Sequence, residues 1–173
     1  MVANSRLKLF SFLLALLVVL LTGFWLMNRS GLALPSDIKA NINFKVVYPA
    51  KDYRIDNNSF QYLNEADTLL YKASAAGRII SMSQQPTPDN FDLEKVVQGA
   101  SQTLTQGKGY TLINTKLGQA AITSFYSDKD LSKISQSAIL ESNGTLVTAQ
   151  LLNEQSWSQA DWEKFLNSLR LGK

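Results

Sequence analysis

An uninterrupted apolar segment near the amino terminus constrains this chain more than any other feature. Residues 9–27 carry no charge, and only Ser11, Thr22 and Gly23 interrupt the apolar side chains. As a helix rising about 1.5 Å per residue, such a segment measures roughly 28 Å, close to the hydrocarbon thickness of a bilayer. The sequence therefore predicts one membrane-spanning helix, and the chain that follows is expected to form a tethered domain.

Basic residues on either side of this segment predict its orientation. Arg6 and Lys8 precede it and Arg29 follows it, so the positive-inside rule places residues 1–8 in the cytoplasm and the rest outside. A cleaved signal peptide has similar features, but the length of the segment favours its retention as an anchor. We therefore expect a single-pass protein of the cell membrane, with its amino terminus in the cytoplasm.

Breaks in the pattern divide the chain into four expected regions. These are a tail over 1–8, a transmembrane anchor over 9–27, a linker over 28–41 and an extracytoplasmic domain over 42–173. Gly31 and Pro35 disfavour a helix in the linker, so an extended spacer is expected there.

Charge and composition exclude several functional classes. The net charge is +3, but Arg6, Lys8 and Arg29 supply the whole excess, and the remaining 14 Lys and Arg residues balance the 14 Asp and Glu residues. Nucleic-acid binding is therefore not expected. The chain has no His and no Cys, which excludes Ser–His and Cys–His hydrolase chemistry and the commonest transition-metal ligand. We expect no enzymatic activity, cofactor or metal.

Alternating apolar side chains predict a series of strands joined by short turns. In the first of them Val47 is assigned to the polar face. In the fourth, Ile80 and Met82 share the face opposite Ile79. Asn143-Gly144 is the strongest hairpin signal, because both residues tolerate positive φ angles. The expected strands are 42–48, 59–63, 68–74, 78–85, 110–116, 119–126, 133–141 and 145–152, and the polar region 50–58 has room for a short strand over 53–55.

Two amphipathic helices complete the pattern. The first begins at Asp92 as its cap, and its apolar stripe includes Val96 and Val97. The second covers 158–171, where Ser158 and Asp161 form a capping box. Trp157, just before that box, is expected to pack onto Trp162. The predicted class is α+β, with an antiparallel sheet of about 6–8 strands covered by two helices.

Three patterns suggest sites, and each also has a structural explanation. Asp128 and Asp130 offer carboxylates to calcium, but the spacing of an EF-hand is missing, so a solvated turn is preferred. Asn28, Asn57 and Asn143 begin glycosylation motifs at near-chance frequency. Aromatic side chains on the strands are expected in the core, with an apolar cleft as the alternative. They are Tyr48, Tyr53, Phe60, Tyr62, Tyr71, Tyr110, Phe125 and Tyr126.

Short motifs distributed over 42–171 resemble the PsbP-like family. They are Phe44-Lys45-Val46-Val47-Tyr48-Pro49, Asp92-Leu93-Glu94-Lys95, Leu117-Gly118-Gln119-Ala120, Asn143-Gly144-Thr145-Leu146-Val147, and 162–169. The resemblance implies an α+β sandwich and a non-enzymatic accessory role, usually binding another protein. Because the chain lacks His, metal roles within that family carry over to no residue here.

The anchor, the compact domain and the lack of catalytic chemistry predict an accessory domain that binds an envelope protein. The alternative is a carrier or sensor of a small apolar ligand or lipid, held between sheet and helix. A carboxylate-only enzyme is the least favoured interpretation, because most acidic residues fall in turns or on exposed helix faces.

Overall fold

The computed structural model describes residues 34–104, 109–127, 130–152 and 156–172, with side chains described except over 100–104, 125–127 and 130–134. Residues Leu34–Lys173 form a compact unit. No helix in the described ranges is long and apolar enough to cross a membrane. The predicted tail over 1–8 and the predicted span over 9–27 lie outside the described residues.

Within the described ranges, nine strands form two sheets and are accompanied by three α-helices and one 3-10 turn. In chain order they are α2 (Ser36–Asn41), β1 (Val47–Tyr48), β2 (Arg54–Leu63), the turn Asn64–Ala66, β3 (Thr68–Ala75), β4 (Arg78–Pro86), α3 (Leu93–Leu104), β5 (Tyr110–Thr115), β6 (Gly118–Ser127), β7 (Asp130–Ser142), β8 (Thr145–Leu151), α4 (Gln159–Ser168) and β9 (Arg170–Leu171).

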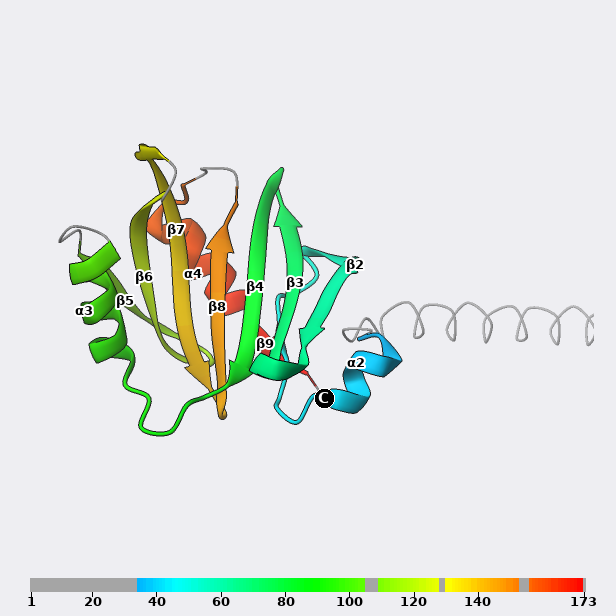
Figure 1. Cartoon of the computed structure of the whole chain (residues 1–173). Helices are drawn as coiled ribbons and strands as arrows, with labels where there is room; N and C mark the ends of the chain where they lie inside the picture. The colour runs from blue at the N-terminus through cyan, green and yellow to red at the C-terminus, as the bar shows by residue number, and fades with distance from the viewer. Residues whose placement is uncertain (1–33, 105–108, 128–129, 153–155, 173) are drawn as a thin grey trace, which may run out of the picture. The chain divides into compact units, whose positions relative to one another are not determined.

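Seven strands form one fully antiparallel sheet in the order β2-β3-β4-β8-β7-β6-β5 (Figure 1). Strands β1 and β9 make a separate two-stranded sheet, which pairs the start of the domain with its end. The predicted α+β class and antiparallel sheet are therefore confirmed. The strand order places β2 and β5 at the two edges of the large sheet.

The local turn and strand signals correctly place the central hairpins. Asn143 and Gly144 have φ angles of 52° and 78°, and they join β7 to β8 with Ser142 opposite Thr145. In β4, Ile80 and Met82 are fully buried on one face, as predicted. These features depend on neighbouring residues alone, so the sequence pattern is sufficient to predict them.

The two faces of the sheet are covered differently. Helix α4 runs behind the strands in Figure 1 and buries Trp162, Phe165 and Leu166. The buried core of the sheet consists of Leu69, Tyr71, Ala73, Ile80, Met82, Ala120, Ala138, Leu140, Val147, Ala149 and Leu151. Helix α3 packs against β6, β5 and β7. On β6, Ala121 and Thr123 alternate with core residues and are buried as well, so both faces are covered at this end.

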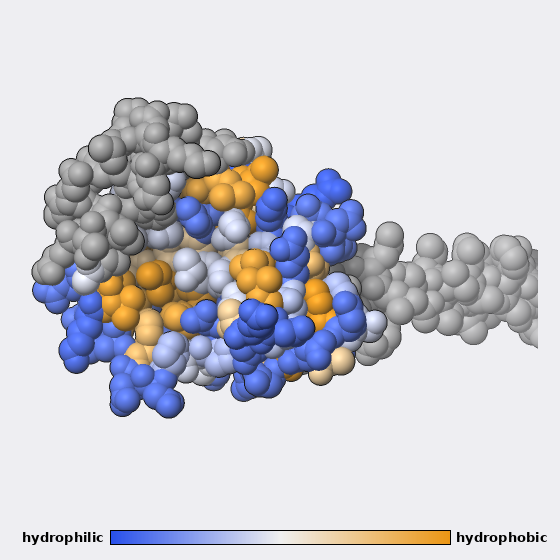
Figure 2. All heavy atoms as spheres, in the orientation of Figure 1, coloured by the Kyte–Doolittle hydropathy of each residue, from blue (hydrophilic) through white to orange (hydrophobic). Residues whose placement is uncertain are grey.

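The rest of the second face is open to solvent. In β4 and β8, Ser81, Ser83, Thr148 and Gln150 alternate with core residues and are partly exposed. Figure 2 shows this side of the unit, where apolar patches are separated by hydrophilic side chains. An antiparallel sheet with one solvated face commonly has this pattern.

The structure corrects the prediction for the start of the domain. The linker is not wholly extended, because Ser36–Asn41 form α2 after Pro35, and Ile38 is buried. The strand predicted over 42–48 is reduced to Val47–Tyr48. Val47, assigned to the polar face, is fully buried. Contacts with residues far along the chain determine this arrangement.

Further differences from the prediction occur in β2, α3 and α4. Strand β2 begins at Arg54 rather than residue 59 and contains a register shift between Asp56 and Gln61. Val96 is 43% exposed and does not belong to the buried stripe of α3, whereas Val97 is fully buried. Helix α4 ends at Ser168, because the residues after Leu169 pair with β1 as β9.

Candidate functional site

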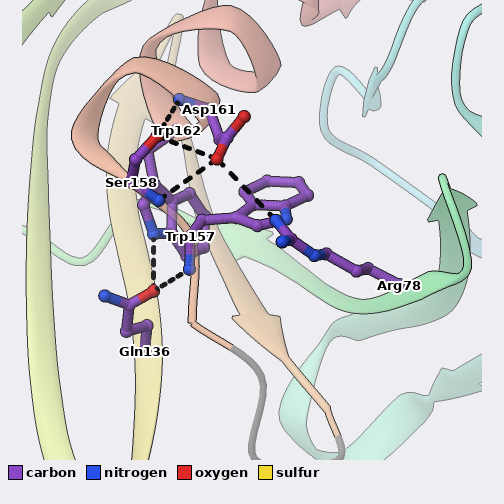
Figure 3. A network of polar contacts seen from close by, with 6 residues as sticks. All are labelled: Arg78, Gln136, Trp157, Ser158, Asp161 and Trp162. Atoms are coloured by element: carbon purple, nitrogen blue, oxygen red, sulfur yellow. Dashed lines mark hydrogen bonds and ion pairs between the residues drawn. The ribbon is translucent and has the colours of Figure 1, made fainter.

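A dense cluster of polar contacts surrounds the first turn of α4 (Figure 3). The Asp161 amide donates to Ser158 Oγ at 3.2 Å, and the Ser158 amide donates to Asp161 Oδ2 at 3.2 Å. Trp157 packs edge-to-face on Trp162, with ring centroids 5.0 Å apart. The predicted capping box and the predicted contact between the two Trp residues are both confirmed.

Gln136 and Arg78 connect this turn to the sheet (Figure 3). On β7, Gln136 Oε1 accepts hydrogen bonds from the Trp157 amide at 2.6 Å and from Trp162 Nε1 at 3.2 Å. At the start of β4, Arg78 Nη1 lies 3.7 Å from Asp161 Oδ2. The cluster therefore holds the start of α4 against β4 and β7.

The chemistry of this cluster suits a structural role. The hydrogen bond from the Ser158 side chain lowers the pKa of Asp161, with a further contribution from Arg78. A carboxylate held in its ionised form by a cap is poorly suited to transferring protons near neutral pH. We assign these residues to helix capping rather than catalysis.

A second polar cluster is buried beneath the sheet. Gln84 Oε1 accepts from the Val47 amide at 2.8 Å, and Gln84 Nε2 donates to the Val47 carbonyl. The Tyr71 hydroxyl donates to the same carbonyl at 2.8 Å. One side chain thus satisfies both main-chain groups of Val47, which explains why a residue outside the large sheet is fully buried. Burial raises the pKa of Tyr71, so its hydroxyl remains a donor.

A third contact joins α2 to the turn between β2 and β3. The Tyr62 hydroxyl hydrogen bonds to Asp67 Oδ1 and lies 3.3 Å from the Asn41 carbonyl. The bond to Asp67 raises the pKa of Tyr62. Asp67 has a positive φ of 46°, and its side chain contributes to the turn. These residues fix α2 beside β2 and bring together no nucleophile and base.

Only some of the predicted calcium and glycosylation residues lie within the part of the chain that the structure describes. Asp128 lies outside the described residues, as does the side chain of Asp130, so the calcium hypothesis stays a prediction. Among the described residues, no three His, Cys, Asp or Glu side chains are grouped as metal ligands. Asn57 is exposed on β2, and Asn143 is exposed in the β7–β8 turn. Asn28 lies outside the described residues.

The aromatic side chains that suggested a cleft are largely used in packing. Tyr53 and Tyr71 are buried, and Tyr53 packs against Phe165 with ring centroids 5.0 Å apart. Phe60 lies beside Tyr71, with centroids 5.3 Å apart. Tyr48, Tyr62 and Tyr110 are partly exposed. The side chains of Phe125 and Tyr126 lie outside the described set. The burial of Tyr53 and Tyr71 supports the prediction that the aromatic side chains of the strands lie in the core.

The two edge strands of the large sheet differ from each other, and the sequence pattern did not reveal this difference. Edge strand β2 is interrupted by its register shift and carries the charged residues Arg54 and Asp56. Edge strand β5 pairs with β6 without interruption from Tyr110 to Thr115 and contains neither a charge nor a proline. Recognising β5 as an edge requires the β4–β8 pairing, which joins strands far apart in the chain.

Comparisons with protein-family models, curated proteins and solved structures give no match for this chain. The resemblance to the PsbP-like family therefore stays a prediction based on short motifs. The α+β fold itself rests on the strand pairing described above.

Proposed function

We propose that this chain is a single-pass membrane protein whose α+β domain is displayed outside the cytoplasm and binds an envelope protein. The observation that carries the proposal is the uncharged apolar segment over 9–27, followed by the compact unit of Leu34–Lys173. A segment of this length and composition suits a bilayer span. The polar clusters around Asp161, Gln84 and Tyr62 support an accessory role, because their side chains act in capping and packing.

Membrane anchoring is tested first. In cells that make the full-length chain, the protein should stay with membranes after an alkaline carbonate wash. Val18→Asp places a charge in the apolar segment and should release most of the protein, because a charged side chain near the bilayer centre costs about 3 kcal/mol or more. Val18→Leu is the matched control and should remain in the membrane. Release of the wild type by the wash to the same extent as Val18→Asp would rule out the anchor.

The orientation has a direct readout, because the chain contains no Cys. A single Cys introduced as Gln61→Cys, at an exposed position of β2, should react with a membrane-impermeant maleimide in intact cells. Ser5→Cys should react only after the cells are lysed. The reverse pattern of labelling would overturn the proposed topology.

Partner binding is tested by crosslinking the anchored full-length chain in cells, followed by mass spectrometry of the products. One envelope protein should recur among the crosslinked products and be absent when Val18→Asp releases the chain. If the anchored chain gives no recurrent protein product, the accessory role is wrong.

A further inference from the structure

We infer that the free edge of β5 is the docking surface, and that an extended segment of the partner protein binds there as an eighth strand of the sheet. This inference rests on the proposed function and assigns to it a surface and a mode of binding. Strand addition provides affinity through main-chain hydrogen bonds, and it needs a regular, unpaired edge. Among the described strands, β5 pairs with β6 on one side only.

The pairing of β5 with β6 determines which groups face outward. Thr115 and Gly118 flank a two-residue turn and are opposite each other in the register. In such a hairpin the flanking residues form a hydrogen-bonded pair, and such pairs alternate along the ladder. The main-chain groups of Leu112 and Asn114 are therefore directed away from β6. They are the positions at which an added strand would donate and accept hydrogen bonds.

The opposite edge shows what a protected strand looks like in this same sheet. On β2, Asp56 Oδ1 accepts from the Asn58 amide at 3.0 Å, and Ser59 Oγ donates to the Asp56 carbonyl at 2.6 Å. These local bonds lie within the register shift and use polar groups of the strand. Bulges and charges are devices that prevent strand addition at an edge. Strand β5 has neither device.

The size of the edge favours a partner segment over a second copy of this chain. Six residues extend over about 20 Å. Two β5 edges paired over that length alone would bury much less surface than the roughly 1,200 Å² buried in stable protein interfaces. An extended peptide instead uses main-chain bonds together with pockets for alternate side chains. Helices α3 and α4 both contact β5, so an added strand would have a helix near each face. A segment with apolar side chains on both of its faces fits this setting.

The test uses the anchored full-length chain in cells, with a photoreactive amino acid at one of two exposed edge positions. Thr111 lies on β5 and Gln61 on β2. The probe at Thr111 should crosslink to one envelope protein through a single extended segment, and the probe at Gln61 should not. Asn114→Pro removes an outward amide and should lower the Thr111 product about tenfold. Asn114→Ala keeps that amide and should leave the yield within about twofold.

The outcomes separate this inference from the proposed function. The same partner captured equally from Gln61, or a yield unchanged by Asn114→Pro, would overturn the β5 edge while leaving envelope-protein binding intact. A product joining two copies of this chain would also overturn the partner-strand assignment. No protein product from Thr111 would overturn the β5 edge; if general crosslinking of the anchored chain still captures one envelope protein, the accessory role stands, and if it captures none, both proposals are wrong. If Asn114→Pro alters the thermal unfolding profile, Asn114→Lys serves as the second variant, because a charge at the edge opposes strand addition.

Discussion

Helices α3 and α4 cover opposite faces of one sheet, but they contribute to the core in different ways. Helix α4 buries Trp162, Phe165 and Leu166, whereas Val97 is the one buried residue among the described side chains of α3. The strands beneath α3 present small side chains, including Ala121 and Thr123. The difference indicates that α4 completes the main core and that α3, over its described side chains at 93–99, contributes less to it.

The largest expected effect comes from truncating the α4 contact. Trp162→Ala removes a fully buried ring and its hydrogen bond to Gln136. We expect the free energy of unfolding to fall by about 3–5 kcal/mol, because large-to-small substitutions in a core lose burial and leave a cavity. Urea denaturation of the full-length chain in detergent, followed by Trp fluorescence, measures this change. A loss below about 1 kcal/mol would contradict the central role of α4.

A truncation on α3 tests the other side of the comparison. Val97→Ala removes two buried methyl groups and should cost about 2 kcal/mol. Its neighbour Val96 is 43% exposed, so Val96→Ala is the matched control and should change stability by less than about 0.5 kcal/mol. Urea denaturation of the full-length chain in detergent compares Val97→Ala with Val96→Ala. A Val97→Ala loss as large as that of Trp162→Ala would remove the distinction between the helices.

The start of α4 should contribute less than its buried face. Ser158→Ala removes the side-chain acceptor for the Asp161 amide and should cost about 1 kcal/mol. Ser158→Thr retains a hydroxyl at the cap and should lose only a small part of that stability. Thermal unfolding followed by circular dichroism distinguishes the two variants. Equal losses would indicate that packing at this position, rather than the hydrogen bond, stabilises the helix.

The parts of the fold that the sequence predicts well depend on nearby residues. The Ser158–Asp161 box and the Asn143-Gly144 turn each occupy a few consecutive positions. The same holds for the buried face of β4, where period-two alternation is sufficient. Local hydrogen bonding and alternation are strong signals because the interacting groups are adjacent in the chain.

The parts that were predicted wrongly depend on distant contacts. Val47 is buried because Gln84, 37 residues later, satisfies its main-chain groups. Its strand pairs with β9, whose residues the sequence assigned to the last helix. The candidate docking edge has the same origin, because β5 becomes an edge only when β4 pairs with β8. Alternation within a strand says which residues share a face, but not which strand lies beside it.

Acidification should cause the smallest of the expected changes in stability, because α3 and α4 each begin with one capping carboxylate. These are Asp92 for α3 and Asp161 for α4. The amide of Lys95 donates to Asp92 and lowers its pKa, and the Ser158 side chain does so for Asp161. A carboxyl with a lowered pKa in the folded state stabilises the fold above its unfolded pKa. That contribution is lost as the pH falls below the ordinary value of 3.8 and through the folded pKa. The free energy of unfolding should therefore decrease on acidification in this range.

Substitutions at these two carboxylates separate their contributions. Asp161→Asn and Asp92→Asn should each flatten the acid limb of the stability profile, measured by urea unfolding at a series of pH values. Asp161 accepts from the amide and the hydroxyl of Ser158, and Asp92 accepts from the Lys95 amide with the Lys95 ammonium 3.1 Å away, so the two substitutions should flatten the limb to a similar extent. The double variant should equal the sum of the singles, because the two caps have no shared partner among the described contacts. An unchanged acid limb in the double variant would show that other carboxyl groups control the response to acid.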